Sequence, residues 1–122
     1  MMHNLLRWNI ADREIKAMRD LLKPGGMIGI EQHRAKANAP FSYTDGSKGY
    51  LREKDVIAFM ELNGFEYVGS SKANANPKDP ANWPDGVWTL QPALRGAKDE
   101  DKPRLQAIGE SDRMTLLFRK RA

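Results

Sequence analysis

The feature that most constrains the fold of this chain is an abrupt break between an amphipathic segment and a short apolar run. Residues 11–22 place Ile15, Met18 and Leu22 at helical spacing, which predicts a helix with one buried face. A lysine-proline-glycine-glycine turn ends that helix, because proline cannot continue it and glycine supplies the backbone angles of a turn. Residues 27–31 follow at once. Their mostly apolar character, without alternation, predicts a strand covered on both faces.

The pattern of a helix followed by a strand then repeats. Residues 52–63 are expected to form a second helix, with Val56 and Met60 on its buried face. Gly64 is the residue type that commonly follows the last turn of a helix, and residues 65–70 read as the next strand. Helices that alternate with strands predict a layered α/β domain with a parallel pair of strands.

The last element is expected to be a strand of a different kind. Met114, Leu116 and Phe118 alternate with Thr115 and Leu117, which is the period of a strand with one buried face. Residues 103–107 are expected to form at most a short helix, and no crossover helix is evident before the last strand, so we expect that strand to run antiparallel to its neighbours.

A long proline-rich segment separates the second strand from the last one. Five of the seven prolines fall in it, and an irregular stretch of this length is unusual in a small domain. It is either a lid or a segment anchored by its own aromatic side chains, Trp83 and Trp88, and we favour the anchoring interpretation. The expected organisation is a single α/β domain over residues 1–122, with helix-strand-helix-strand in 1–72, the insertion in 73–112, and the closing strand and basic tail in 113–122.

Composition limits the classes of protein to consider. The 122 residues include 40% hydrophobic side chains, no cysteine and a net charge of +4. Without cysteine there are no disulfides and no thiolate metal sites. No apolar run approaches the roughly 20 residues of a membrane helix, and the start is too short and polar for a signal peptide, so we expect a cytoplasmic protein without a membrane partner. Charges of both signs are interspersed outside residues 119–121, so nucleic acid is not an expected partner.

Three turns, in this order, resemble turns of one large enzyme family. Residues 21–30 are similar to the passage into the fifth strand of class I (Rossmann-like) S-adenosylmethionine-dependent methyltransferases. Residues 63–68 resemble the turn before the family's sixth strand, and residues 112–120 resemble its closing antiparallel strand. Residues 31–35 and 76–80 are similar to a bacterial branch described as predicted methyltransferases. The resemblance implies the carboxy-terminal half of that fold, with the closing strand between the other two.

The chain lacks the parts with which that family binds its cofactor. A glycine-rich turn after the first strand approaches the cofactor, and an acidic residue that ends the second strand holds the ribose hydroxyls. Here Gly25 and Gly26 follow a helix, while Gly46 and Gly49 lie in an expected loop. We therefore expect a truncated methyltransferase-like protein, inactive alone and without tight binding of S-adenosylmethionine, in which Met1 is an internal methionine. The alternative is a small stand-alone homo-oligomeric interaction module derived from half of the fold.

Candidate site residues come from both the pattern and the resemblance. His33 lies at the carboxyl end of a predicted strand, where open α/β sheets bind ligands, and its near-neutral pKa suits a general base. The alternative, which we favour from sequence alone, is a surface histidine without chemistry. By the resemblance, His3 and Asn4 line the cofactor pocket; the favoured alternative for them is a frayed terminus.

Tyr43, Tyr50 and Arg52 are candidates for substrate binding. They fall in the loop and helix start after the first strand, the region that the resemblance places over a substrate. A tyrosine can orient a hydroxyl or an amine, and an arginine can bind an acidic group. Loop anchoring is the alternative that we favour for each of them. The two histidines lie far apart in the sequence without a ligand cluster, so we expect no metal site.

Association of the chain follows from the same resemblance. The strand at residues 27–31 should lie at a sheet edge, where the family's fourth strand would pair. An exposed apolar edge is a template for pairing with another chain. We therefore expect a homodimer or another assembly that covers this edge, with the missing amino-terminal half as a further partner.

Overall fold

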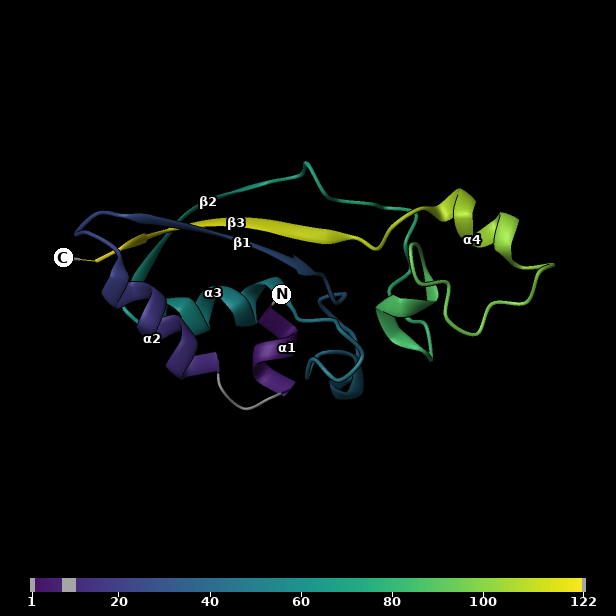
Figure 1. Ribbon diagram of the computed structural model, residues 1–122, viewed down its shortest axis with the longest axis horizontal. Coiled ribbons are helices and arrows are strands. Elements are labelled where there is room, and N and C mark those ends of the chain that lie inside the picture. Colours follow the sequence, from purple (N-terminus) through teal and green to yellow (C-terminus); the bar gives the residue numbers. More distant parts are fainter. Residues whose placement is uncertain (1, 8–10, 122) are drawn as a thin grey trace.

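The computed structural model is a mixed α/β structure, and it describes residues 2–7 and 11–121 (Figure 1). Its order of elements confirms the predicted sequence of helix, strand, helix, strand, insertion and closing strand. The short helix α1 is added to the two main helices, and α4 lies where residues 103–107 were expected to form at most a short helix. The elements are α1 (Met2–Arg7), α2 (Ala11–Leu21), β1 (Met27–His33), the 3₁₀ helix Phe41–Tyr43, α3 (Glu53–Leu62), β2 (Phe65–Ser71), the 3₁₀ helix Gly86–Thr89, α4 (Lys102–Ile108) and β3 (Arg113–Lys120).

The three strands form one sheet in the order β1-β3-β2. β3 is antiparallel to both neighbours, with Ile30 opposite Leu116 on one side and Tyr67 opposite Phe118 on the other. Because β1 and β2 both oppose β3, they run parallel to each other. The predictions that the closing strand is antiparallel and lies between the other two are therefore confirmed.

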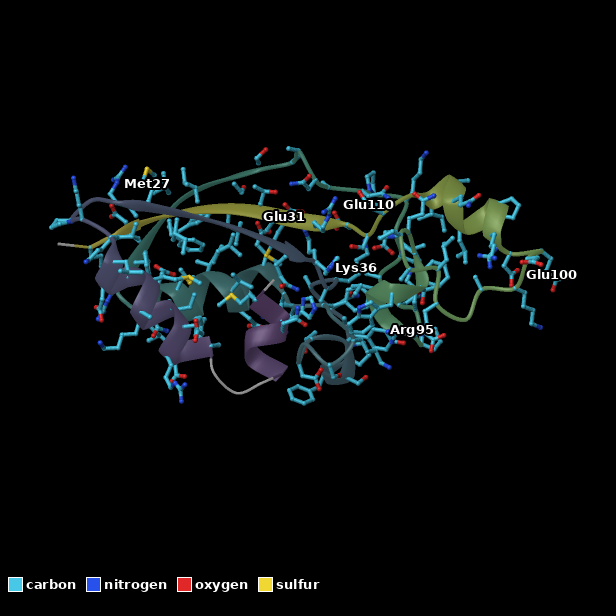
Figure 2. The ribbon with its side chains drawn as sticks, in the orientation of Figure 1. Met27, Glu31, Lys36, Arg95, Glu100 and Glu110 are labelled. Atoms are coloured by element: carbon cyan, nitrogen blue, oxygen red, sulfur yellow. The ribbon has the colours of Figure 1, made fainter. Side chains whose placement is uncertain are left out.

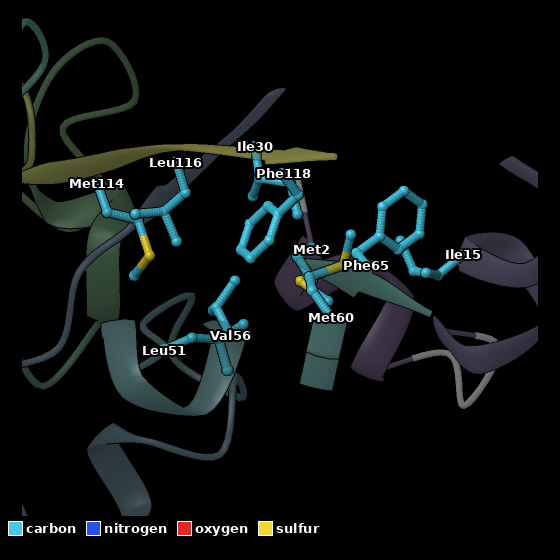
Figure 3. Packing of buried hydrophobic residues seen from close by; sticks show 10 residues of the cluster. All are labelled: Met2, Ile15, Ile30, Leu51, Val56, Met60, Phe65, Met114, Leu116 and Phe118. Atoms are coloured by element: carbon cyan, nitrogen blue, oxygen red, sulfur yellow. The ribbon is translucent and has the colours of Figure 1, made fainter. Parts of the chain in front are cut away.

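Helices α1, α2 and α3 lie on one face of the sheet, and the core forms between them and the strands (Figures 1 and 3). The buried side chains of β3 alternate as predicted. The apolar stripe of α2 is narrower than expected. Ile15 is buried and Leu22, just after the helix, packs on the core, but Met18 is 39% exposed. The buried members of this core are Met2, Ile15, Ile30, Leu51, Val56, Met60, Phe65, Met114, Leu116 and Phe118.

The prediction that β1 is covered on both faces is wrong. Its burial alternates, and Met27 and Glu31 lie on the face opposite the helices (Figure 2). Met27 is 42% exposed, and the exposed Gly29 between them has no close neighbour above its backbone. The physical reason is that α1, α2 and α3 pack on the same side of the sheet, so the outer face is open to solvent. A shallow hollow of about 370 Å³ lies on this face, beside Gly29 and Gly69.

The proline-rich insertion lies beyond the carboxyl end of β1 (Figure 1) and has its own small core. Trp83 and Trp88 pack against a cluster of Ala35, Tyr50, Ala81 and Val87. The indole Nε1 of Trp83 also donates a hydrogen bond of 3.0 Å to Asp79. The anchoring interpretation of the two tryptophans is thus confirmed.

None of the helices within residues 2–7 and 11–121 combines the length and the apolar character needed to span a membrane.

Candidate functional site

Four segments meet at the carboxyl end of β1. His33 is the last residue of that strand, and its carbonyl oxygen accepts a hydrogen bond of 3.1 Å from the Leu51 amide. The next residue, Arg34, donates its amide to Asp112 at 2.8 Å. Helix α1 packs beneath this point, and the insertion lies beyond it. This is the end of the sheet at which open α/β folds bind ligands.

Gln32 organises the buried side of this site. Its side chain is fully buried, and its Oε1 accepts a hydrogen bond of 3.0 Å from the backbone amide of His3 and lies 3.2 Å from Nδ1 of that residue. Its Nε2 donates to the carbonyl oxygens of Gly49 at 2.8 Å and His33 at 3.2 Å. One amide thus links α1, β1 and the loop that follows β1.

His3 is placed very differently from a frayed terminus. It is 4% exposed, and Gln32 binds it through both backbone and ring. That alternative interpretation is therefore wrong, because the buried amide of Gln32 holds the first turn of α1 against the sheet. Asn4 follows on the same helix and is half-buried. The predicted cofactor-binding role of both residues stays a prediction.

His33 lies among rings and a buried hydroxyl. Its ring centroid is 5.5 Å from that of His3, and the His3 ring in turn meets Trp88 edge-on at 6.2 Å. The Nδ1 atom of His33 is in close hydrogen-bond contact with Oγ of Ser111, which is itself buried. His33 is half-buried and bonded through its ring, so it is not a free surface side chain.

The electrostatic surroundings keep the His33 ring neutral. Burial is the largest of the causes that lower its pKa to about 4, and the charges of His3 and Arg113 contribute in the same direction. A neutral imidazole has one ring nitrogen that can accept a hydrogen bond. A pKa of about 4 makes the ring a weak base at neutral pH, so the general-base role of His33 stays a prediction that this shift does not favour.

A buried carboxylate fixes the segment that carries Ser111. Asp79 is fully buried, and its Oδ2 accepts the amide of Asp112 at 2.9 Å. Its Oδ1 accepts the amide of Ala81 at 2.9 Å and the indole of Trp83 at 3.0 Å. The two ends of the insertion are tied together at this carboxylate, which holds Ser111 beside β1.

Sequence reasoning missed Gln32, Asp79 and Ser111. Gln32 had a usable signal, because it is two residues from Ile30 and so faces the same, buried side of β1. Asp79 and Ser111 lie in irregular segments with many other small polar residues, and nothing in the sequence distinguishes them from exposed loop residues.

The structure does not gather Tyr43, Tyr50 and Arg52 around His33. The Tyr43 hydroxyl donates to the carbonyl of Asn82 at 3.1 Å, and its ring stacks on Tyr50 at 6.1 Å. Tyr50 is fully buried in the small core of the insertion, and burial raises its pKa. These contacts support the favoured anchoring interpretation for both tyrosines.

Arg52 immediately precedes α3, and its Nε donates to Asp55 of that helix at 2.8 Å. This ion pair stabilises the first turn, where the helix dipole favours a carboxylate. A role of Arg52 in holding an acidic substrate stays a prediction, as it does for the two tyrosines.

A pocket of about 420 Å³ opens between α1, α3 and the loop after β1. Its size is within the range of small-molecule sites, and its walls are largely apolar. Both carboxylates at its walls have partners already, since Asp55 binds Arg52 and Asp45 binds Ser47. The described residues that line it are Met2, Phe41, Thr44, Asp45, Leu51, Asp55, Val56 and Phe59.

In the part of the chain that the structure describes, no three histidine, aspartate or glutamate side chains come close enough to hold a metal ion.

The chain matches no protein-family model, no curated protein and no solved structure.

Proposed function

We propose that this chain is methyltransferase-like and supplies the acceptor-facing half of an S-adenosylmethionine-dependent site. The observation that carries the proposal is the sheet order β1-β3-β2, in which the last strand inserts antiparallel between two parallel strands. That is the order implied by the resemblance of the three turns. It is also an order that local sequence periodicity does not dictate.

The position of the two histidines supports the same proposal. His33 and His3 lie at the carboxyl end of β1, with ring centroids 5.5 Å apart. The His33 ring stays neutral at neutral pH, so one of its nitrogens can accept a hydrogen bond from an amine or hydroxyl acceptor and orient it. In this class of reaction the cofactor supplies the methyl group, and the protein supplies binding and orientation.

The described residues do not fit the adenosine part of the cofactor by themselves. The turn after β1 begins with Arg34, Ala35 and Lys36, and the turn after β2 begins with Lys72 and Ala73. Neither is a glycine-rich turn that leads directly into a helix, which is the geometry that binds such cofactors. The proposal therefore assigns cofactor binding to a second structural half.

A fusion protein tests this assignment. An amino-terminal methyltransferase half, with its glycine-rich turn and its first four strands, would be fused to residue 2 of this chain. Isothermal titration with S-adenosylmethionine and with its demethylated product should show one-to-one binding to the fusion. This chain alone should bind neither ligand more tightly than about 1 mM.

The control fusion carries the same amino-terminal half joined to a variant chain that ends before β3. It lacks the strand that distinguishes the proposed topology and should not bind. A cooperatively folded fusion of the full chain that binds neither ligand would contradict the proposal.

A second candidate function is a stand-alone homo-oligomeric interaction module. The observation that favours it is the open outer face of the sheet, where Met27, Val68 and Leu117 are 38–42% exposed. Exposed apolar side chains on one surface are characteristic of association sites. Two results together would favour this candidate over the first: this chain forms a stable oligomer, and the fusion protein does not bind the cofactor.

A further inference from the structure

The hydrogen bonds between β1 and β3 determine which backbone groups of β1 face outward. The amide of Lys120 donates to the Gly26 carbonyl at 2.7 Å, and the amide of Arg34 donates to Asp112 at 2.8 Å. In an antiparallel ladder the residues that bond to one neighbour alternate with those that point away from it. Even-numbered residues of β1 therefore bond to β3, and odd-numbered residues direct their backbone groups to the other edge.

Met27, Gly29 and Glu31 thus present amide and carbonyl groups along the outer edge of β1. Within the described residues, β3 is the only strand of the sheet that pairs with β1. Leu51 forms an isolated β-bridge with Arg34, just past the end of β1. This bridge leaves the outer backbone groups of residues 27–31 unpaired. An unpaired strand edge of this kind is a template for another strand.

The edge of β2 at the other side of the sheet is protected in a way that β1 is not. The register of β2 shifts between Tyr67 and Gly69, which marks a bulge at Val68. A bulge twists an edge strand and interrupts its ladder, so it opposes pairing with a further strand. β1 keeps a continuous register with β3 from Met27 to His33, and its outer edge is regular.

The inner face of β1 is complementary to itself about Gly29. In an antiparallel pair of two β1 strands with Gly29 opposite Gly29, Ile28 lies opposite Ile30 of the other copy on the helix-covered face. Met27 then lies opposite Glu31 of the other copy on the outer face. Ile30 is 8% exposed and Ile28 packs against the core, so this pairing joins two apolar cores.

We infer that two copies of this chain associate through the outer edges of their β1 strands, and form one continuous six-stranded sheet around a two-fold axis at Gly29. The symmetric contact is closed, so it produces a dimer and not a filament. The interaction is strand addition, in which backbone hydrogen bonds supply affinity and the facing side chains supply specificity. It goes beyond the proposed function and does not depend on cofactor binding.

Opposite charges introduced at one exposed position test the register. Met27 lies opposite Glu31 of the other copy, and that carboxylate also binds Arg113 of its own chain. Met27→Glu places a second carboxylate beside it at two symmetric contacts, and should raise the dimer dissociation constant by about threefold or more. Met27→Lys places an ammonium opposite the same carboxylate and should leave the constant unchanged or lower it. Sedimentation velocity over a range of protein concentrations measures both constants.

Val68→Glu and Val68→Lys are the matched controls. Val68 is exposed to the same extent as Met27, at 42%, but it belongs to β2. Neither control should change the dissociation constant of the dimer by more than about twofold. Circular dichroism and a cooperative thermal transition verify that each variant is folded.

A third variant, Gly29→Pro, removes the outward amide at the two-fold axis without removing a bond to β3, and it should give a folded monomer. Three results would overturn the inference: a native chain that is monomeric at every concentration, equal effects of the two Met27 substitutions, or a dimer that Val68→Glu weakens and Met27→Glu does not. The last result would assign the contact to the outer face or to β2.

Discussion

At the scale of single residues, the structure depends on buried polar side chains that the sequence does not reveal. Gln32 and Asp79 are both fully buried. The Gln32 amide donates hydrogen bonds to backbone carbonyl oxygens, and the Asp79 carboxylate accepts them from backbone amides. Hydrophobic periodicity locates apolar faces, but it carries no information about which polar residue is buried in a loop. His33 was a sequence candidate because of its position at a strand end. Its neighbours His3 and Ser111 were brought to it by tertiary packing alone.

The first prediction concerns the pH dependence of stability that His33 produces. Its pKa falls from 6.5 to about 4 on folding, chiefly because of burial. Between these two values the unfolded chain binds more protons, so the His33 contribution to stability is complete above pH 6.5 and is lost as the pH falls towards 4. The complete shift corresponds to a loss of about 3 kcal/mol in the free energy of unfolding.

Urea unfolding at pH 7 and pH 4.5 measures the free energy of unfolding of the native chain and of His33→Gln. The contributions of the carboxylates are the same in both proteins, so they cancel when the two pH-dependent losses are compared. The native chain should lose more stability than the variant. Ser111→Ala should keep the native pH dependence, because burial and not the hydroxyl is the main cause of the shift. An identical pH dependence for the native chain and His33→Gln would contradict the assignment.

At the scale of elements, both main helices and all three strands were predicted from periodicity and turn residues. The insertion could not be predicted in detail, because its order comes from contacts between segments far apart in the sequence. The amide of Val87 donates to the Lys48 carbonyl oxygen at 3.0 Å, and the amide of Asp112 donates to Asp79 at 2.9 Å. The exposure of one face of β1 was also not predictable, since it depends on where helices pack and not on the strand's own residues.

The second prediction is that Gly86 is essential for docking the insertion. It has a φ of +70°, and a side chain there would collide with the Lys48 carbonyl oxygen. Gly86→Ala should therefore destabilise the chain by more than about 2 kcal/mol, because backbone strain and collision add. Urea unfolding followed by tryptophan fluorescence reports this change, since Trp83 and Trp88 both lie in the insertion.

Gly25→Ala is the matched control for this substitution. Gly25 has a similar φ of +78°, but no atom lies within 4 Å of the position that its side chain would take. Gly25→Ala should lower the free energy of unfolding only by the backbone strain, about 1 kcal/mol. Equal losses for the two substitutions would show that contact with Lys48 does not hold the insertion in place.

At the scale of the whole molecule, the sheet order was predicted only through a resemblance. Local patterns predict strands and helices, but each of the three possible orders of three strands is compatible with them. The same outer edge of β1 has two proposed occupants: a second copy of this chain, and the fourth strand of an added amino-terminal half. The two proposals are separable, because a fusion that binds the cofactor and covers this edge should be a monomer even at concentrations at which this chain dimerises.

We propose above all that the carboxyl end of β1 forms the acceptor-facing side of a methyl-transfer site. The most direct measurement is a nuclear Overhauser experiment on the fusion protein with S-adenosylmethionine that carries an isotope-labelled methyl group. We expect contacts from that methyl group to ring protons of His33 or His3. Bound cofactor whose methyl group contacts only residues of the added half would contradict it.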